Sequence, residues 1–161
     1  MSRDHSTPHK LAILGLVTKA RITANVPQNR VETVKKGIKK IGLYGISFKE
    51  GTDDLRFSGG LEIAEKLLGK GYELKIFDSN VSISKLMGKN KEFIFSKLPH
   101  INEILKEDIK SFLDEIELLV IINKDKYLND LRKYVNKELI IIDFVGTDLN
   151  ELVSDYEGIC W

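Results

Sequence analysis

The chain has 161 residues, of which 42% are apolar and 30% charged, a composition typical of one globular domain and too short for two large ones. Its 25 Lys and Arg against 24 Asp and Glu give a formal charge of +1, so neither nucleic acid nor a membrane surface is expected as a partner. One cysteine, Cys160, excludes an internal disulfide, three scattered histidines give no metal-ligand spacing, and together these features favour a cytoplasmic protein.

The first forty residues are predicted to be helical. Thr7-Pro8 is a typical helix start, and the apolar positions that follow as far as Ala20 give a broad apolar surface that needs a partner. We therefore expect the chain to form a homodimer. After Pro27, a second helix is predicted from Gln28 to about Lys40, with its lysines on a solvated face.

From Ile41 onward, short apolar runs alternate with helical stretches, which predicts an α/β fold: a Rossmann-like open parallel sheet with flanking helices. We accordingly divide the chain into a helical segment, 1–40, and a Rossmann-like domain, 41–161. The predicted strands are Ile41–Ser47, Tyr72–Asp78, Leu118–Asn123 and Leu139–Phe144. The predicted helices are Gly60–Lys70, Ser82–Met87, Asp108–Ile116 and Tyr127–Tyr134, with a less regular stretch at Phe93–Leu98.

The loop after the first strand is unusually long for a strand-to-helix connection, and ligands of open parallel sheets bind at this end of the strands. Lys49 offers a point charge, Arg56 a planar fork, and Ser58-Gly59-Gly60 free amides at a helix start, which together suit a phosphate-bearing anion. Alternatively, Asp53 and Asp54 neutralise these cations and shape an Asx turn. The local chemistry leaves both interpretations open, and we set aside acid–base catalysis by the aspartate pair.

A dinucleotide site is disfavoured by the glycine spacing. Gly42 and Gly45 lie within the first strand, whereas a pyrophosphate fingerprint needs G-x-G-x-x-G at the strand-to-helix turn. Asp78 stands where a ribose-binding acid would lie, but we favour its interpretation as the first residue of the turn Asp78-Ser79-Asn80.

Residues 45–56, GISFKEGTDDLR, resemble the G-x-x-F-K-x-x-T-D-D-x-R signature of the UDP-glucose/GDP-mannose dehydrogenase family. Four further motifs are similar to the GDP-mannose branch of that family: GKGYEL at 69–74, NKEF at 90–93, SKLPH at 96–100 and EGICW at 157–161. The resemblance covers about residues 28–161.

The resemblance implies the C-terminal, nucleotide-sugar-binding domain of an NAD-dependent enzyme that oxidises GDP-mannose to GDP-mannuronate for polysaccharide synthesis. It implies that residues 1–40 are a remnant of the middle domain or connecting helix. NAD and the catalytic cysteine then belong to domains that this chain lacks, so it binds no cofactor or metal, carries no catalytic residue, and is expected to be inactive alone. The alternatives are a UDP-glucose-type domain, and a free-standing, non-catalytic module for nucleotide-sugar binding or dimerisation.

The resemblance also assigns individual residues. Lys49 matches the lysine that contacts the nucleotide sugar, and Phe48 the aromatic residue before it. Arg56 matches the motif arginine, which either binds the ligand or holds the loop. Thr52, Asp53 and Asp54 shape the loop. The chain departs from the pattern at residues 56–59, which read RFSG in place of RESP, and at residue 145, where a valine replaces the arginine of UDP-glucose enzymes. Cys160 lies outside the family's G-G-x-C context, so we interpret it as structural.

Overall fold

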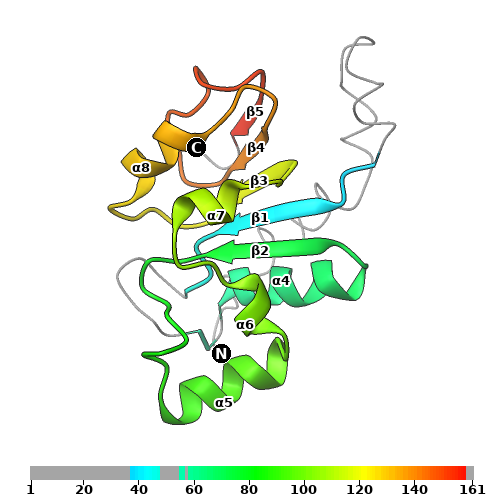
Figure 1. Ribbon diagram of the computed structural model, residues 1–161, viewed down its shortest axis with the longest axis vertical. Helices are drawn as coiled ribbons and strands as arrows, with labels where there is room; N and C mark the ends of the chain where they lie inside the picture. The colour runs from blue at the N-terminus through cyan, green and yellow to red at the C-terminus, as the bar shows by residue number, and fades with distance from the viewer. Residues whose placement is uncertain (1–36, 48–54, 57, 159–161) are drawn as a thin grey trace, which may run out of the picture. The chain divides into compact units, whose positions relative to one another are not determined.

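A computed structural model of the chain describes residues 37–47, 55–56 and 58–158. Its sheet is built from five parallel strands in the order β2-β1-β3-β4-β5 (Figure 1). The strands are β1 (Lys40–Tyr44), β2 (Glu73–Phe77), β3 (Leu118–Ile121), β4 (Ile140–Asp143) and β5 (Asp155–Gly158). The predicted α/β class with an open parallel sheet is therefore confirmed.

The fifth strand was not expected from the sequence. β5 reads DYEG and lacks the apolar run that marks the other strands. It forms at the edge of the sheet because β4 offers it a complete row of partners, beginning with Ile140 opposite Asp155. An edge strand has one solvated side, which explains how so polar a segment joins the sheet.

The described helices are α4 (Gly59–Gly69), α5 (Gly88–Lys97), α6 (Ile101–Ile104), α7 (Ile109–Leu113) and α8 (Leu128–Tyr134). The helix predicted over Ser82–Met87 is wrong: this segment is a turn, in which the amide of Leu86 donates to the carbonyl of Ser82. The stretch Phe93–Leu98, predicted to be irregular, lies largely in α5. Ile94 is the one buried residue of that helix, so its sequence carries no apolar period.

The second predicted helix does not extend to Lys40 as expected. Residues 37–39 are not helical, and Lys40 belongs to β1; the rest of that predicted helix lies outside the described residues. The helix predicted from Thr7 to Ala20 lies outside the described residues, as does Cys160.

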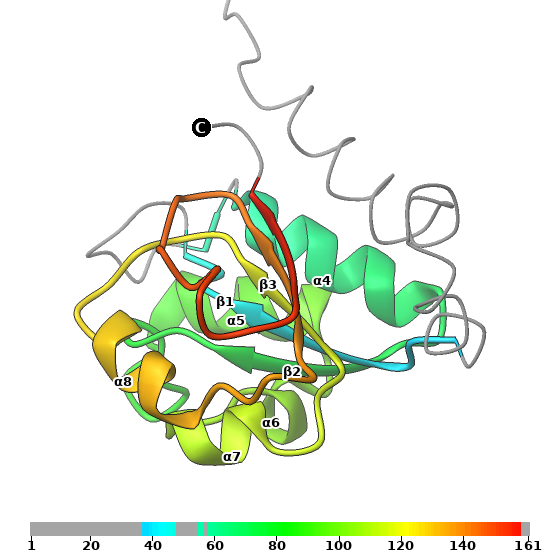
Figure 2. The same cartoon turned by 90° about the horizontal axis from the view of Figure 1, so that it is seen from above.

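Two helical layers cover the sheet, α4 on one face and α7 with α8 on the other (Figures 1 and 2). Gly42 makes the second layer fit closely. A Cβ at this position would lie 2.7 Å from Ile116 Cδ1 and 3.0 Å from Phe112 Cζ, so α7 and the residues after it pack directly over the β1 backbone. Gly42 therefore allows close packing of this helical layer on the sheet.

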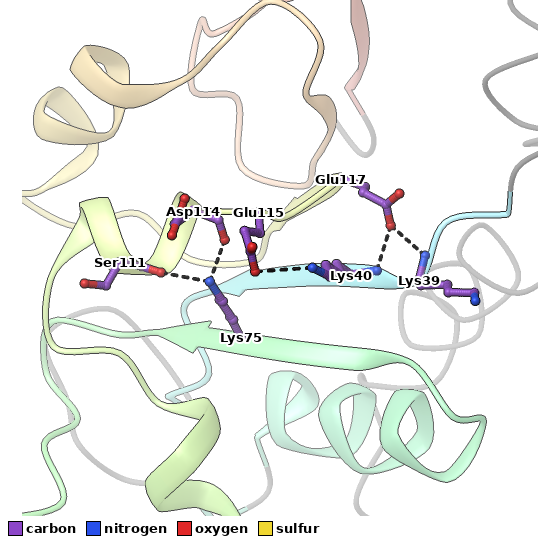
Figure 3. A network of polar contacts seen from close by, with 7 residues as sticks. All are labelled: Lys39, Lys40, Lys75, Ser111, Asp114, Glu115 and Glu117. Carbon is purple, nitrogen blue, oxygen red and sulfur yellow. Dashed lines mark hydrogen bonds and ion pairs between the residues drawn. The ribbon is translucent and has the colours of Figure 1, made fainter.

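At the amino end of the sheet, exposed charges join neighbouring segments (Figure 3). The Glu117 carboxylate accepts hydrogen bonds from the amides of Lys39 and Lys40, at 2.8 and 2.9 Å, and these bonds hold its pKa below the usual range. Lys40 pairs with Glu115 at 3.2 Å. The Lys75 ammonium donates to two carbonyls at the end of α7. Side chains in contact with water therefore connect neighbouring segments at this amino end of the sheet.

Candidate functional site

The carboxyl end of the sheet is the natural place for a ligand, because the chain leaves β1 and β3 in opposite directions there. Neighbouring strands in the order β2-β1-β3 bring three exits side by side: Gly45 to Ser47 after β1, Asp78 after β2, and Asn123 after β3. The long loop with the predicted ligand residues starts at the middle one of these exits.

Asp78 anchors the first residues of that loop. Its side chain is 5% exposed, and Oδ2 accepts the amides of Ile46 and Ser47, each at 2.8 Å. Its other oxygen accepts the Asn80 amide at 2.9 Å, which confirms the turn expected at Asp78-Ser79-Asn80. A carboxylate that holds three backbone amides acts as a clamp on the backbone, so Asp78 fixes where the long loop begins.

Asn123 anchors the same segment from β3. Its side-chain amide donates to the Ser47 carbonyl at 2.8 Å. Gly45 permits this approach: its φ is +86°, and a Cβ there would lie 2.7 Å from the Asn123 Cβ. Any other residue at position 45 would face both an unfavourable backbone conformation and a clash.

The returning end of the loop is fixed by Ser58. Its hydroxyl caps α4 by accepting the Leu61 amide at 3.2 Å, and it also donates to the Ile46 carbonyl. Gly60 brings the helix start close to β1, since a Cβ there would lie 2.8 Å from Ile46 Cα. Leu55, fully buried, accepts the Ser58 amide through its carbonyl. The serine that RFSG shares with the usual RESP therefore caps α4, and Gly59 begins the helix where the usual motif has proline.

Of the predicted site residues, the structure describes Arg56, which lies in an exposed turn three residues before α4. Phe48, Lys49, Thr52, Asp53 and Asp54 lie outside the described residues, so their assignments stay predictions. What the structure adds is the stem. This stem consists of residues 45–47, which are hydrogen-bonded to Asp78 after β2 and to Asn123 after β3, and of Ser58, which is hydrogen-bonded to Ile46.

A second aspartate, Asp125, orders the connection after β3. It accepts the Tyr44 hydroxyl and, at 2.9 Å, the amide of Tyr127. Burial, and then this hydrogen bond, raises the pKa of Tyr44 above its ordinary value. Tyr44 therefore acts as a neutral hydrogen-bond donor from the core to this connection.

A third aspartate, Asp143, ends β4 and is completely buried. Its two oxygens accept five hydrogen bonds of 2.5–2.9 Å, from the amides of Val145, Gly146 and Thr147 and from the hydroxyls of Thr147 and Tyr156. Burial opposes the charge, but these donors outweigh it and hold the pKa of Asp143 below its usual range. Val145, where UDP-glucose enzymes are expected to carry an arginine, thus sits on a firmly held turn.

The anchoring residues Asn123, Asp125 and Asp143 were not predicted as site residues. The signal was present, because each follows or ends an apolar strand. The partners of Asn123 and Asp125 at the end of β1 are far away in the sequence, whereas those of Asp143 lie within 13 positions. Asn123 bonds a residue 76 positions away, and Tyr44 meets Asp125 across 81 positions. Local patterns do not contain such pairs.

Neither a metal centre nor a membrane span is found among the described residues. No group of three or more side chains there is arranged to hold a metal ion. Each helix in this part of the chain falls short of the length and apolarity that crossing a bilayer requires.

Comparison with known proteins matches most of the sheet and its connections. The UDP binding domain of the UDP-glucose/GDP-mannose dehydrogenase family matches residues 42–147. The GDP-mannose 6-dehydrogenase of Pseudomonas aeruginosa is 44% identical over 123 residues, covering 76% of this chain and 28% of that protein. The enzyme of the same name from Azotobacter vinelandii is 42% identical over 127 residues, covering 79% and 29%. The chain thus spans less than a third of these relatives.

Solved structures of dehydrogenases are also similar to this chain. A ternary complex of GDP-mannose dehydrogenase from Pseudomonas aeruginosa superimposes with a TM-score of 0.67 at 42% identity, covering 82% of this chain and 30% of the other. A UDP-glucose dehydrogenase from Pyrobaculum islandicum gives a TM-score of 0.58 at 21% identity, with coverage of 83% and 28%. The second likeness shows the shared fold.

Proposed function

The chain belongs to the UDP-glucose/GDP-mannose dehydrogenase family, and we propose that it is the nucleotide-sugar-binding domain of an NAD-dependent GDP-mannose 6-dehydrogenase. The 44% identity with the Pseudomonas aeruginosa protein supports the choice of GDP-mannose over UDP-glucose. The observation that carries the binding role is the double anchoring of the Lys49 loop at the carboxyl end of the sheet.

An anchored stem prepares the loop for binding. Asp78, Asn123 and Ser58 fix the backbone on both sides of the loop before any ligand arrives. Less conformational entropy is then lost when the ligand binds, so more of the contact energy appears as affinity. In this proposal, Lys49 contacts the diphosphate, Phe48 packs beside it, and Arg56 contacts the ligand or holds the loop. Thr52, Asp53 and Asp54 shape the loop between them.

The proposal is tested by Lys49→Ala, with binding of GDP-mannose measured by calorimetry at millimolar ligand. Loss of one charge-assisted hydrogen bond, worth about 1–3 kcal/mol, should raise the dissociation constant about 5- to 150-fold. Lys39→Ala is the matched control, because Lys39 is an exposed lysine at the opposite end of the sheet. Unchanged affinity in Lys49→Ala, with an unchanged melting temperature, would mean that the lysine only neutralises a neighbouring aspartate.

Catalysis, in this proposal, belongs to the whole enzyme. NAD is the oxidant in the whole enzyme, while this domain binds and orients the nucleotide sugar. The sequence of this chain contains neither a G-x-G-x-x-G turn nor a G-G-x-C segment. We therefore expect the chain alone to form no reduced nicotinamide from NAD and GDP-mannose, and spectrophotometric detection of NADH from the purified chain would contradict this.

Homodimerisation remains part of the proposal through the apolar positions between Thr7 and Ala20, which lie outside the described residues. Sedimentation at micromolar concentration should show a dimer that dissociates when residues 1–27 are deleted. A full-length chain that is monomeric would contradict this expectation.

A further inference from the structure

Tyr44 is the last residue of β1 and is buried, with 1% exposure. Its ring packs against those of Phe77 and Phe112, with centroids 5.4 and 6.2 Å away. In the described core between the sheet and the helices α7 and α8, Tyr44 carries the one hydroxyl of the buried cluster. A phenylalanine would fill the same space without a polar group that needs a partner, so packing alone does not require the hydroxyl.

The Tyr44 hydroxyl holds the connection that follows β3. It donates to the carboxylate of Asp125, which is half-buried and also accepts the Tyr127 amide at 2.9 Å. Burial raises the pKa of Tyr44, so its hydroxyl stays protonated and remains a donor. A hydrogen bond to a carboxylate is strong where little water competes for either partner. This bond therefore fixes the connection to the end of β1.

The same connection carries Asn123, two residues before Asp125. The Asn123 side-chain amide donates to the Ser47 carbonyl at 2.8 Å, three residues after Tyr44. Between these side-chain bonds, the Ile122 amide donates to the Tyr44 carbonyl at 2.9 Å. The bonds made by the Tyr44 hydroxyl and by Asn123 therefore join the same two segments, and loosening one of them gives the other more freedom.

We propose that Tyr44 is a positioning residue for ligand binding: through Asp125 it keeps Asn123 in place to hold the β1 exit. The inference rests on the proposed function and adds to it a residue that acts from within the core. Ordering the β1 exit before a ligand arrives reduces the conformational entropy that binding costs. A weaker hold on the connection should therefore lower the affinity, even where the fold is intact.

The test compares Tyr44→Phe with wild type in the full chain, by calorimetry with GDP-mannose at millimolar ligand. Tyr44→Phe keeps the ring and removes the hydroxyl, so the dissociation constant should rise about three- to tenfold, the range for one lost hydrogen bond. Asp125→Asn keeps an oxygen that accepts both bonds, so its affinity should lie closer to that of wild type. Tyr72→Phe is the matched control and should bind like wild type, because Tyr72 precedes β2 at the amino end of the sheet.

A double-mutant cycle shows whether Tyr44 acts through Asn123. Asn123→Ala alone should weaken binding, because it releases the Ser47 carbonyl. Adding Tyr44→Phe to Asn123→Ala should then weaken binding no further. A second readout needs no ligand: the protons of the Asn123 side-chain amide, followed by NMR, should exchange with solvent faster in Tyr44→Phe than in wild type. A role in packing alone would lower the melting temperature and move neither readout.

Three results would overturn the inference and leave the proposed function standing. They are wild-type affinity in Tyr44→Phe, losses of affinity that add in the double variant, and unchanged exchange of the Asn123 side-chain amide in Tyr44→Phe. If wild type itself binds no GDP-mannose at millimolar concentration, the proposed function fails and the inference fails with it.

Discussion

The two ends of the sheet use the same kinds of side chain in opposite ways. At the carboxyl end, Asp78 and Asp143 are buried, and their carboxylate oxygens accept hydrogen bonds mainly from backbone amides of the loops that leave the strands there. At the amino end, Glu115 and Glu117 are exposed and meet lysines or strand-start amides in contact with water (Figure 3).

This difference shows which end of the sheet holds its loops in a fixed geometry. A buried carboxylate with amide donors fixes a loop in one geometry, because leaving any partner unsatisfied costs free energy. An exposed ion pair contributes little, since water screens it and both side chains lose conformational freedom. Loops that are held precisely are the ones expected to bind a ligand, and they lie at the carboxyl end.

The largest effect should follow from Asp143→Asn. The amide group places N–H donors where two oxygens now accept five hydrogen bonds, so we expect a loss of about 3 kcal/mol in the free energy of unfolding, measured by urea denaturation. Asp148→Asn is the control: Asp148 is exposed with φ +54°, which asparagine tolerates, and a change below about 0.5 kcal/mol is expected. Equal effects would remove the contrast between buried and exposed carboxylates.

The same variant carries a pH signature. The folded-state pKa of Asp143 is lowered, so its charge contributes fully above the unfolded pKa of about 3.9 and is lost as the pH falls through the folded value. The stability difference between wild type and Asp143→Asn should therefore shrink below about pH 4, as followed by thermal unfolding across pH. A difference that grows on acidification would contradict the assignment.

A smaller effect is expected at Asp78. Asp78→Asn keeps one acceptor oxygen for three amide donors, so we expect a loss of about 1–2 kcal/mol in unfolding free energy. Because these amides form the stem of the Lys49 loop, affinity for GDP-mannose should fall as well. Full stability loss with unchanged affinity would separate the stem from the binding site.

The smallest effect belongs to the amino end. Lys40→Ala removes the exposed ion pair with Glu115 and should leave the unfolding free energy nearly unchanged, because water screens such a pair. GDP-mannose binding should be unaffected. A loss comparable to that of Asp143→Asn would show that the exposed network supports the fold as strongly as the buried one.

Elements that depend on local contacts can be predicted from the sequence, whereas those that depend on contacts between distant residues are missed. Four strands and α4 can be predicted because apolar periodicity and the glycines at the end of α4, Gly69 and Gly71, are local signals. β5 is missed because it depends on β4, and α5 because it buries only Ile94. The loop after β1 is identified from its residues, whereas its clamps, Asp78 and Asn123, act on residues 31 to 76 positions away.

The most direct test of this account is an amide chemical-shift map of the chain titrated with GDP-mannose. The account predicts that shifts concentrate at the carboxyl end, at Ile46, Ser47, Asp78 and Asn123, while Lys39, Lys40 and Glu117 at the amino end stay unchanged. Shifts centred on the amino-end residues, with those at Ile46 and Ser47 unmoved, would contradict it.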